Sequence, residues 1–409
     1  MLQNPDRLLD EARTLAADIV ALRRAIHAEP ELGLHTPLTR DKIRVALAGL
    51  PLEWVEGPST TGLVATLRGG AGAGPCVLLR GDMDALPMPE ETGLDFASAV
   101  PGVMHACGHD AHVAMLAGAA RLLCARAESL AGEARFMFQP GEEGHHGARF
   151  MLEDGLLGGG DSGIALPDAA FALHVMPNAP HGLIGGREGA LLAAADQIGI
   201  VVSGRGGHAS MPHDTLDPVP VACEIVSALQ ALVARRYSVF DPVVVTIAKI
   251  EAGTTHNVIP DSARLTGTMR TLSPANRARL QADITRLAEG IAAAHGLAAQ
   301  VTILEGFPPT LCDGRAVTFG EQVARDLYGP QAFLRLPDPI MGAEDFAYVL
   351  EKVPGAMFFL GVAHEGADWQ HCCGIHSTRM MVDETVLPQG AAYLARLAEA
   401  FLAQGGWER

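Results

Sequence analysis

The chain of 409 residues has 30 basic and 47 acidic residues, a formal net charge of −17, and 48% hydrophobic residues. This length exceeds what a single hydrophobic core usually supports, so we expect two domains. The acidic balance argues against a nucleic-acid partner, because binding to a phosphate backbone selects clusters of Lys and Arg. The composition is typical of a globular enzyme rather than of a disordered or fibrous chain.

The N-terminal segment and the cysteines indicate in which cellular compartment the protein is expected. The first twenty residues lack the basic and apolar regions of a secretory signal, and no apolar run reaches the roughly 18 residues of a membrane span. The seven cysteines are odd in number and scattered along the chain, which is typical of reduced thiols. We therefore expect a cytoplasmic protein without a membrane partner.

Apolar spacing predicts helices and strands that alternate in the first half. A helix is expected over residues 7–28, ending before Pro30, and an Ala/Leu-rich helix over 111–126. The strands predicted here are 64–67, 77–79, 134–138 and 169–175. Such alternation predicts an α/β fold, with a mixed, largely parallel sheet and flanking helices.

The middle of the chain has a different order of elements. Strand, helix, two strands, helix and strand are predicted at 198–202, 218–235, 243–249, 263–270, 277–295 and 301–304. This order is that of a ferredoxin-like unit. We expect residues 188–307 to form an inserted lid or dimerisation domain, and residues 1–187 with 308–409 to form the catalytic metal-binding domain. In the last part, a strand at 356–360 is expected between helices at 343–352 and 385–403.

Five short stretches concentrate side chains that can bind a metal. They are Asp82-Met-Asp84, Cys107-Gly-His109-Asp110, Glu142-Glu143, His174 and His376. Four of them stand at the end of a predicted strand or at the start of the next helix, and in open α/β sheets that edge binds ligands. Imidazole, thiolate and carboxylate together suit Zn²⁺, Mn²⁺, Co²⁺ or Ni²⁺ rather than Ca²⁺ or Mg²⁺.

Adjacent glutamates suit hydrolysis at a pair of metal ions. Two ions would activate a water, and a carboxylate that is not a ligand must take its proton and deliver it to the leaving amine. Glu143 can bind metal while Glu142 acts as this base. Taken singly, Cys107 or His174 would be interpreted as a core residue and the glutamates as a solvated turn. Other histidines, such as His105 and His112, are expected to be structural or to support the ligands.

Eight motifs in order resemble the amidohydrolase branch of the M20 metallopeptidase family, which includes hippurate hydrolases, N-acyl-amino-acid amidohydrolases and auxin-conjugate hydrolases. The motifs, which extend from about residue 22 to residue 361, are LRRAIHAEPELG, RGDMDALPMPEETGL, MHACGHDAHVAMLAGAARLL, FMFQPGEEG, ALHVMPNAP, GRGGHASMPH, THNVIPDSARLTGTMRTL and GAEDFAYVLEKVPGAMFFLG. Together they are far more specific than any one of them would be.

This resemblance implies two divalent ions per subunit, manganese or zinc in the first place and cobalt or nickel as alternatives. The implied ligands are Cys107, His109, Glu143, His174 and His376. Cys107 would bridge the ions, where the peptidase branch has an aspartate, and Glu142 would be the general base.

Neighbouring residues are less well defined by the resemblance. Asp84 is expected to orient the site, whereas Asp82 occupies a position where many family peptidases have a metal-binding histidine, and its role stays open. His371 is the alternative to His376. The adjacent Cys372 and Cys373 are expected to be buried spectators, with sensitivity to metal or oxidation as the other interpretation.

The resemblance also gives roles to three residues of the predicted lid. His208 would stabilise the oxyanion, often from the neighbouring subunit of a dimer. Asn257 and Arg270 would hold the free carboxylate of the substrate, and they lie on consecutive segments that could converge. A homodimer or homotetramer through the lid is therefore expected.

The function expected from these residues is metal-dependent hydrolysis of hippurate-like or N-acetyl amino acids to a carboxylic acid and a free amino acid. A dipeptidase or aminoacyl carboxypeptidase of the same superfamily is the enzymatic alternative. From another class, a non-catalytic metal- or ligand-binding protein on this scaffold is the remaining alternative. A free base beside Glu143 argues against it, since a binding protein needs none.

Overall fold

The computed structural model describes residues 5–159 and 163–407, which fold into two compact units. The larger unit comprises Met1–Leu191, Leu311–Asp338 and Asp345–Arg409, and the smaller unit comprises Leu192–Thr310 and Pro339–Glu344. The smaller unit thus begins and ends within a few residues of the predicted lid. It also includes Pro339–Glu344, which we had assigned to the catalytic domain.

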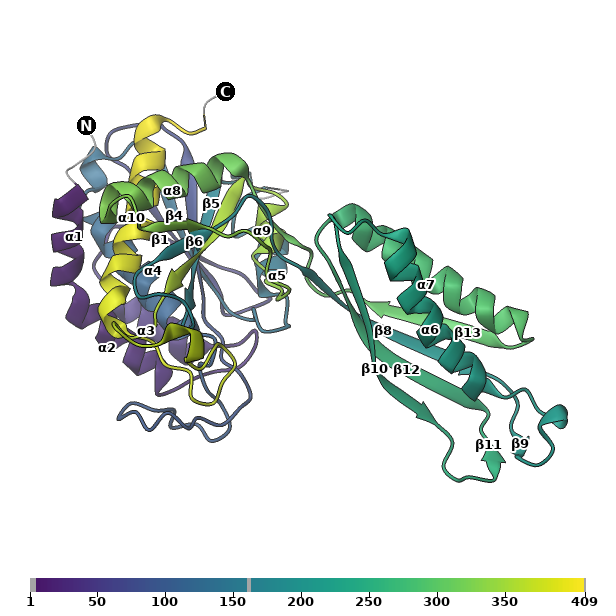
Figure 1. Cartoon of the computed structure of the whole chain (residues 1–409). Helices are drawn as coiled ribbons and strands as arrows, with labels where there is room; N and C mark the ends of the chain where they lie inside the picture. The colour runs from purple at the N-terminus through teal and green to yellow at the C-terminus, as the bar shows by residue number, and fades with distance from the viewer. Residues whose placement is uncertain (1–4, 160–162, 408–409) are drawn as a thin grey trace. The chain divides into compact units, whose positions relative to one another are not determined.

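The larger unit is built on a mixed sheet with helices packed around it (Figure 1). The sheet has eight strands in the order β1-β2-β4-β3-β5-β16-β6-β15. Its strands are β1 (Leu52–Glu56), β2 (Leu63–Arg68), β3 (Cys76–Asp82), β4 (Glu133–Gln139), β5 (Ala169–Met176), β6 (Ile184–Gly186), β15 (Phe333–Arg335) and β16 (Gly355–Gly361). The four central strands, β4, β3, β5 and β16, run parallel to one another. The predicted α/β fold with a largely parallel sheet is confirmed.

Helices cover this sheet. They are α1 (Pro5–Thr14), α2 (Ala16–His27), α3 (Pro37–Ala46), α4 (His109–Cys124), α5 (Gly147–Glu153), α8 (Gly314–Tyr328), α9 (Ala347–Leu350) and α10 (Leu387–Gln404). Helix α4 packs on β3 and β5 and contacts α2 and α10. A Cβ at Gly118 would lie 2.8 Å from Ile19 and 2.9 Å from Ala391, so a small residue permits this close packing.

Two helix predictions needed correction. The helix expected over residues 7–28 is two helices, α1 and α2, which are separated at Leu15. The helix expected over 343–352 is the single turn α9. Apolar periodicity continues through both places, so it could not show where the backbone turns.

Two short strands lie where the chain passes between the units. They are β7 (Gly189–Leu192) and β14 (Thr310–Cys312), and they pair with each other.

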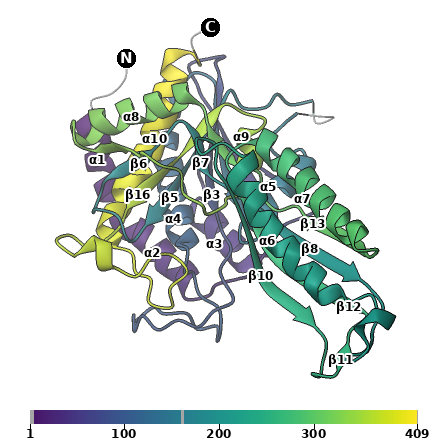
Figure 2. The ribbon, with the colours of Figure 1, turned by 45° about the vertical axis from the view of Figure 1, so that its right-hand side comes forward.

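The smaller unit has the predicted ferredoxin-like order of elements (Figure 2). These are β8 (Ala194–Ser203), α6 (Pro218–Arg236), β10 (Val243–Ala252), β12 (Ser262–Thr271), α7 (Pro274–Ala294) and β13 (Ala298–Leu304), with β9 (Gly207–His208) and β11 (Val258–Ile259) as a separate pair. The sheet order is β10-β12-β8-β13, and all pairs are antiparallel. This confirms the inserted ferredoxin-like fold.

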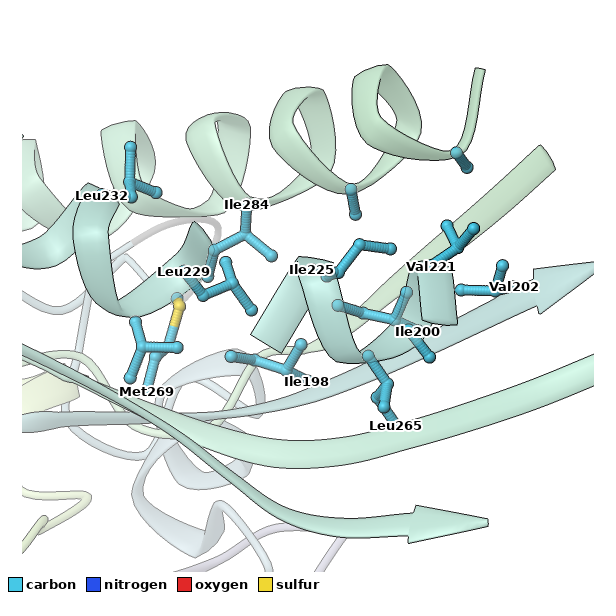
Figure 3. Close-up of a cluster of buried hydrophobic side chains, with 14 of the residues drawn as sticks. Ile198, Ile200, Val202, Val221, Ile225, Leu229, Leu232, Leu265, Met269 and Ile284 are labelled. Carbon is cyan, nitrogen blue, oxygen red and sulfur yellow. The ribbon is translucent and has the colours of Figure 1, made fainter. Parts of the chain in front are cut away.

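The core of the smaller unit lies between its helices and its sheet (Figure 3). Ile198, Ile200 and Val202 alternate along β8 toward the helices, and each is at most 1% exposed. Val221, Ile225 and Leu229 of α6 meet them at helical spacing. Alternation in the strand and i, i+4 spacing in the helix therefore produce one shared apolar layer.

Helix α6 is the one described helix that is long and apolar enough to span a membrane by length and composition alone. Its apolar side chains are part of the core just described. We therefore interpret it as a packing helix of the smaller unit.

Candidate metal centre

The central parallel strands of the larger unit bring most candidate ligands to one edge. Asp82 is the last residue of β3, Glu142 and Glu143 follow the end of β4, and His174 lies near the end of β5. His109 is the first residue of α4, which follows β3 in the chain. Because the carboxyl ends of parallel strands share an edge, residues distant in sequence meet there.

Two groups of three possible donors share the thiol of Cys107. One consists of Cys107, His109 and His174, and the other of Cys107, Glu143 and His376; within each group the donor atoms lie within 4.8 Å of one another. Cys107 Sγ is 3.4 Å from His174 Nε2. The structure therefore brings all five predicted ligands together, with Cys107 common to both groups.

The backbone fixes which nitrogen of two histidines faces this cluster. His109 Nδ1 donates to the carbonyl oxygen of Asp84 over 2.8 Å, and His174 Nδ1 donates to that of Val175 over 2.7 Å. A carbonyl only accepts, so Nδ1 carries the proton and Nε2 keeps its lone pair in the neutral ring. Both Nε2 atoms are thus prepared for a metal ion.

The electrostatics of the cluster fit a cation. Among the residues that the structure describes, His109 Nε2 is buried without a hydrogen-bond partner. Glu143 Oε1 lies 3.3 Å from His376 Nε2. Cys107 and Glu143 raise the pKa of His376 to about 10, so without metal an imidazolium supplies the positive charge. Buried thiol, imidazole and carboxylate donors suit zinc or manganese.

Glu142 lies beside the two groups but belongs to neither. It is 6% exposed, and it lies within 4.8 Å of His109 and Glu143 donor atoms. The carboxylate of Asp84 accepts hydrogen bonds from the backbone N–H groups of Glu142, over 2.9 Å, and Glu143, over 3.1 Å. Asp84 therefore holds the turn that carries both glutamates.

Two unusual backbone conformations shape the cluster. Gly108, between Cys107 and His109, has a φ of 89°, and a Cβ there would lie 2.3 Å from Cγ2 of Val175. His376 is one of two described non-glycine residues with positive φ, at 64°, and its N–H donates to the carbonyl of Ala106. Glycine adopts this conformation freely, whereas for His376 it costs about 1–3 kcal/mol and persists because surrounding contacts enforce it.

The alternative ligand, His371, lies apart from these groups. Its side chain is 81% exposed and pairs with Asp368 over 2.8 Å. Cys372, which is half-buried, donates to the backbone oxygen of Asp368. His376 is therefore the histidine of this segment that meets Cys107.

In the smaller unit, His208 and Asn257 are neighbours. His208 of β9 pairs with Val258 of β11, and Ala209 N–H donates to the carbonyl of Asn257. His208 Nδ1 accepts from the backbone N–H and the hydroxyl of Ser210, over 3.1 and 2.8 Å. In the neutral ring the proton is therefore on Nε2, which makes this nitrogen a donor.

Arg270 does not converge with these two residues. Strand β12 begins at Ser262, five residues after Asn257, and Ser262 pairs with Ser203 of β8. Arg270 lies near the other end of β12 and pairs with Ala195. Eight residues of strand separate Ser262 from Arg270, or about 27 Å. The expected convergence of Asn257 and Arg270 within one lid is wrong, because sequence order did not show that they flank opposite ends of one strand.

Arg80 is a buried residue near the site that we did not predict. It is 2% exposed, it pairs with Asp82, and it donates to Gln139 over 2.9 Å. Burial by itself would raise the pKa of Asp82, but Arg80, His109 and His112 lower it well below its usual range. The available signal was an arginine inside the apolar strand sequence CVLLRGD, where a charge requires a partner.

A family model described as peptidase family M20/M25/M40 matches residues 78–400 of the chain. The chain belongs to this family. It is therefore an M20-type metallo-hydrolase that acts on amide bonds.

Two curated members of the family and one solved structure are similar over most of their lengths. N-acetylcysteine deacetylase of Bacillus subtilis is 39% identical over 93% of this chain and 96% of its own length. Thermostable carboxypeptidase 1 of Saccharolobus solfataricus is 37% identical over 97% of this chain and 98% of its own. A Bacillus subtilis structure described as a dinuclear metal binding peptidase from the M20 family matches with a TM-score of 0.82 and 35% identity, covering 96% of this chain and 99% of that one.

Proposed function

We propose that this M20 hydrolase cleaves the amide bond of N-acyl amino acids, either hippurate-like or N-acetyl, to give a carboxylic acid and a free amino acid. The observation that carries the proposal is the pair of donor groups sharing Cys107, with Glu142 beside them and in neither. The similarity to an N-acetylcysteine deacetylase supports a small N-acyl amino acid as substrate.

Two divalent ions would be held by Cys107 with His109 and His174 on one side, and by Cys107 with Glu143 and His376 on the other. When bound, such ions polarise an acyl carbonyl and lower the pKa of water. The donor set favours manganese or zinc, with cobalt or nickel as alternatives. The two-metal character of a solved M20 relative supports this arrangement.

Glu142 moves the proton in this proposal. Its carboxylate takes a proton from the attacking water and delivers it to the nitrogen of the leaving amino acid. The hydrogen bonds from the Glu142 and Glu143 backbone to Asp84 keep the two glutamates in fixed relation. One carboxylate can then serve as a ligand while its neighbour serves as a base.

The smaller unit contributes substrate recognition. His208 donates through Nε2–H to the developing oxyanion, Asn257 assists nearby, and Arg270 grips the free carboxylate of the substrate through its planar guanidinium. His208 pairs with Val258, which precedes the start of β12, and Arg270 lies near the end of β12, so one lid does not bring both to one substrate. This supports a homodimer or homotetramer in which His208 and Asn257 reach the site of a neighbouring subunit.

A second candidate activity is that of a carboxypeptidase or dipeptidase. The similarity to a thermostable carboxypeptidase favours it, and the same metal ligands and base would serve a peptide bond. The two activities differ in the acyl group that the site accepts.

One panel of assays separates these activities. Metal-free protein is reloaded with Mn²⁺, Zn²⁺, Co²⁺ or Ni²⁺ in turn, and each form receives hippurate, N-acetyl amino acids and dipeptides. We expect the highest kcat/KM on an N-acyl amino acid. Faster cleavage of dipeptides would support the second candidate, and no cleavage of any amide by any metal form would refute both.

A further inference from the structure

Both carboxylate oxygens of Asp82 have hydrogen-bond partners within the protein. Asp82 is fully buried, and Oδ1 accepts a hydrogen bond from His112 Nδ1 over 2.6 Å. Oδ2 accepts one from the guanidinium of Arg80. Oδ2 also lies 3.5 Å from His109 Nε2, so it is close to the donor cluster without being free of other partners.

His112 is engaged on both ring nitrogens. Because Nε2 accepts from the backbone N–H of Val175 over 2.8 Å, its lone pair is directed to that amide. Nδ1 then carries the proton that is donated to Asp82. The ring packs against His174, with centroids 4.5 Å apart, and against His109, at 5.4 Å.

The same residue of β5 connects this chain of hydrogen bonds to a predicted ligand. Val175 donates its N–H to His112, and its carbonyl accepts from Nδ1 of His174. Its side chain also occupies the space over Gly108, between Cys107 and His109. The position of the Val175 backbone therefore affects His174 directly and the Cys107–His109 turn through packing.

We propose that Asp82 and His112 are positioning residues, which fix the Val175 backbone and thereby the orientation of His174, and that neither is itself a metal ligand. Arg80 compensates the buried charge of Asp82. The proposal rests on the metal centre of the proposed function but not on the identity of the substrate. Hydrogen-bonded partners behind metal ligands typically change metal affinity by about 10- to 100-fold when they are removed.

The test measures metal binding rather than turnover. His112→Ala, His112→Gln and Asp82→Asn are prepared in the full-length chain, and Zn²⁺ affinity and stoichiometry are measured by competition with a chelating dye. We expect His112→Ala and Asp82→Asn to keep two ions per subunit while one of them binds about 10- to 100-fold more weakly. The visible spectrum of the Co²⁺ form should change in band position, because the geometry at His174 changes.

Two further variants make the result specific. Glutamine can both donate and accept, so His112→Gln should recover most of the affinity. His105→Ala is the matched control, because His105 is also a buried histidine, at 1% exposure, and no described residue hydrogen-bonds to its ring. It should leave affinity within about threefold of the wild type.

Three results would overturn the proposal. Loss of one whole ion in Asp82→Asn or His112→Ala would make that residue a ligand. Equal weakening in His105→Ala would assign the effect to a general packing defect. Affinity in His112→Gln no better than in His112→Ala would remove the role of the hydrogen bonds, provided that circular dichroism shows both variants folded. Absence of amide hydrolysis would refute the proposed function and leave these binding results unaffected.

Discussion

Substitution of Gly108 by alanine tests how tightly the Cys107–His109 turn is packed. Gly108 has a φ of 89°, and an added Cβ would meet Cγ2 of Val175 at 2.3 Å, well inside contact distance. The change therefore imposes a left-handed backbone on a residue with a Cβ and, in addition, forces β5 away from the start of α4.

The two costs can be separated by magnitude. The left-handed conformation costs a non-glycine residue about 1–2 kcal/mol, and overpacking a buried position costs about 1–3 kcal/mol. Gly49→Ala is the matched control, since Gly49 has a φ of 80° and no described atom lies within 4 Å of its added Cβ. We expect the control to show the conformational cost alone and Gly108→Ala to show both.

The assay is urea unfolding of the metal-free protein, together with Zn²⁺ affinity of the folded protein. Gly108→Ala should lower the free energy of unfolding by about 1–3 kcal/mol more than Gly49→Ala does. It should also weaken Zn²⁺ binding, while Gly49→Ala should not. Equal stability losses with unchanged metal binding in both variants would refute the view that Val175 and Gly108 pack as one support for the ligands.

Three other predictions concern chemistry and pH. Glu142→Gln should lower kcat by about 10²- to 10⁴-fold while keeping both metal ions, and full activity in this variant would refute its role as base. His208→Ala should lower kcat by about 10²- to 10³-fold with metal content unchanged, whereas an effect on KM alone would contradict oxyanion stabilisation. Burial lowers the pKa of His105 to about 3, so the unfolded chain binds a proton below about pH 6.5 that the native chain does not. Stability should therefore fall with decreasing pH by up to about 1.4 kcal/mol per pH unit from this group, and urea unfolding of metal-free His105→Leu should show a shallower pH dependence; identical slopes would contradict this.

Much of the fold could be predicted because the dominant signals are local. Strand β8 alternates apolar residues, α6 places them at helical spacing, and the order of elements alone defines a ferredoxin-like unit. The boundary at Leu15 was missed because both α1 and α2 keep an apolar face, and periodicity says nothing about a break between them. The segment Pro339–Glu344 joined the smaller unit through tertiary contacts that no local pattern contains.

The grouping of the candidate ligands was predictable to a similar extent. Strand ends and residue types were sufficient to group Cys107, His109, Glu143 and His174, because parallel strands converge at one edge. The residues that hydrogen-bond behind the ligands, such as His112, were not predictable in the same way. Whether His112 binds metal or supports a ligand depends on which of its nitrogens meets a backbone N–H, and that contact is set by the register of β5 against α4.

In the lid, the separation of two residues along the sequence does not indicate their distance in space. Asn257 and Arg270 are only thirteen positions apart in the sequence, yet β12 lies between them and carries the second residue to the other end of the sheet. A strand is the most extended form of the chain, at about 3.4 Å per residue, so a short sequence separation across one strand means a long spatial separation.

If His208, Asn257 and Arg270 serve one substrate, two copies of the lid must contribute, and activity should then depend on association. A variant lacking Arg270 mixed with one lacking His208 should recover part of the activity through hybrid dimers, since one of the sites in such a dimer is complete. If no activity is recovered after subunit exchange, the proposal that two subunits contribute these residues to one active site is wrong.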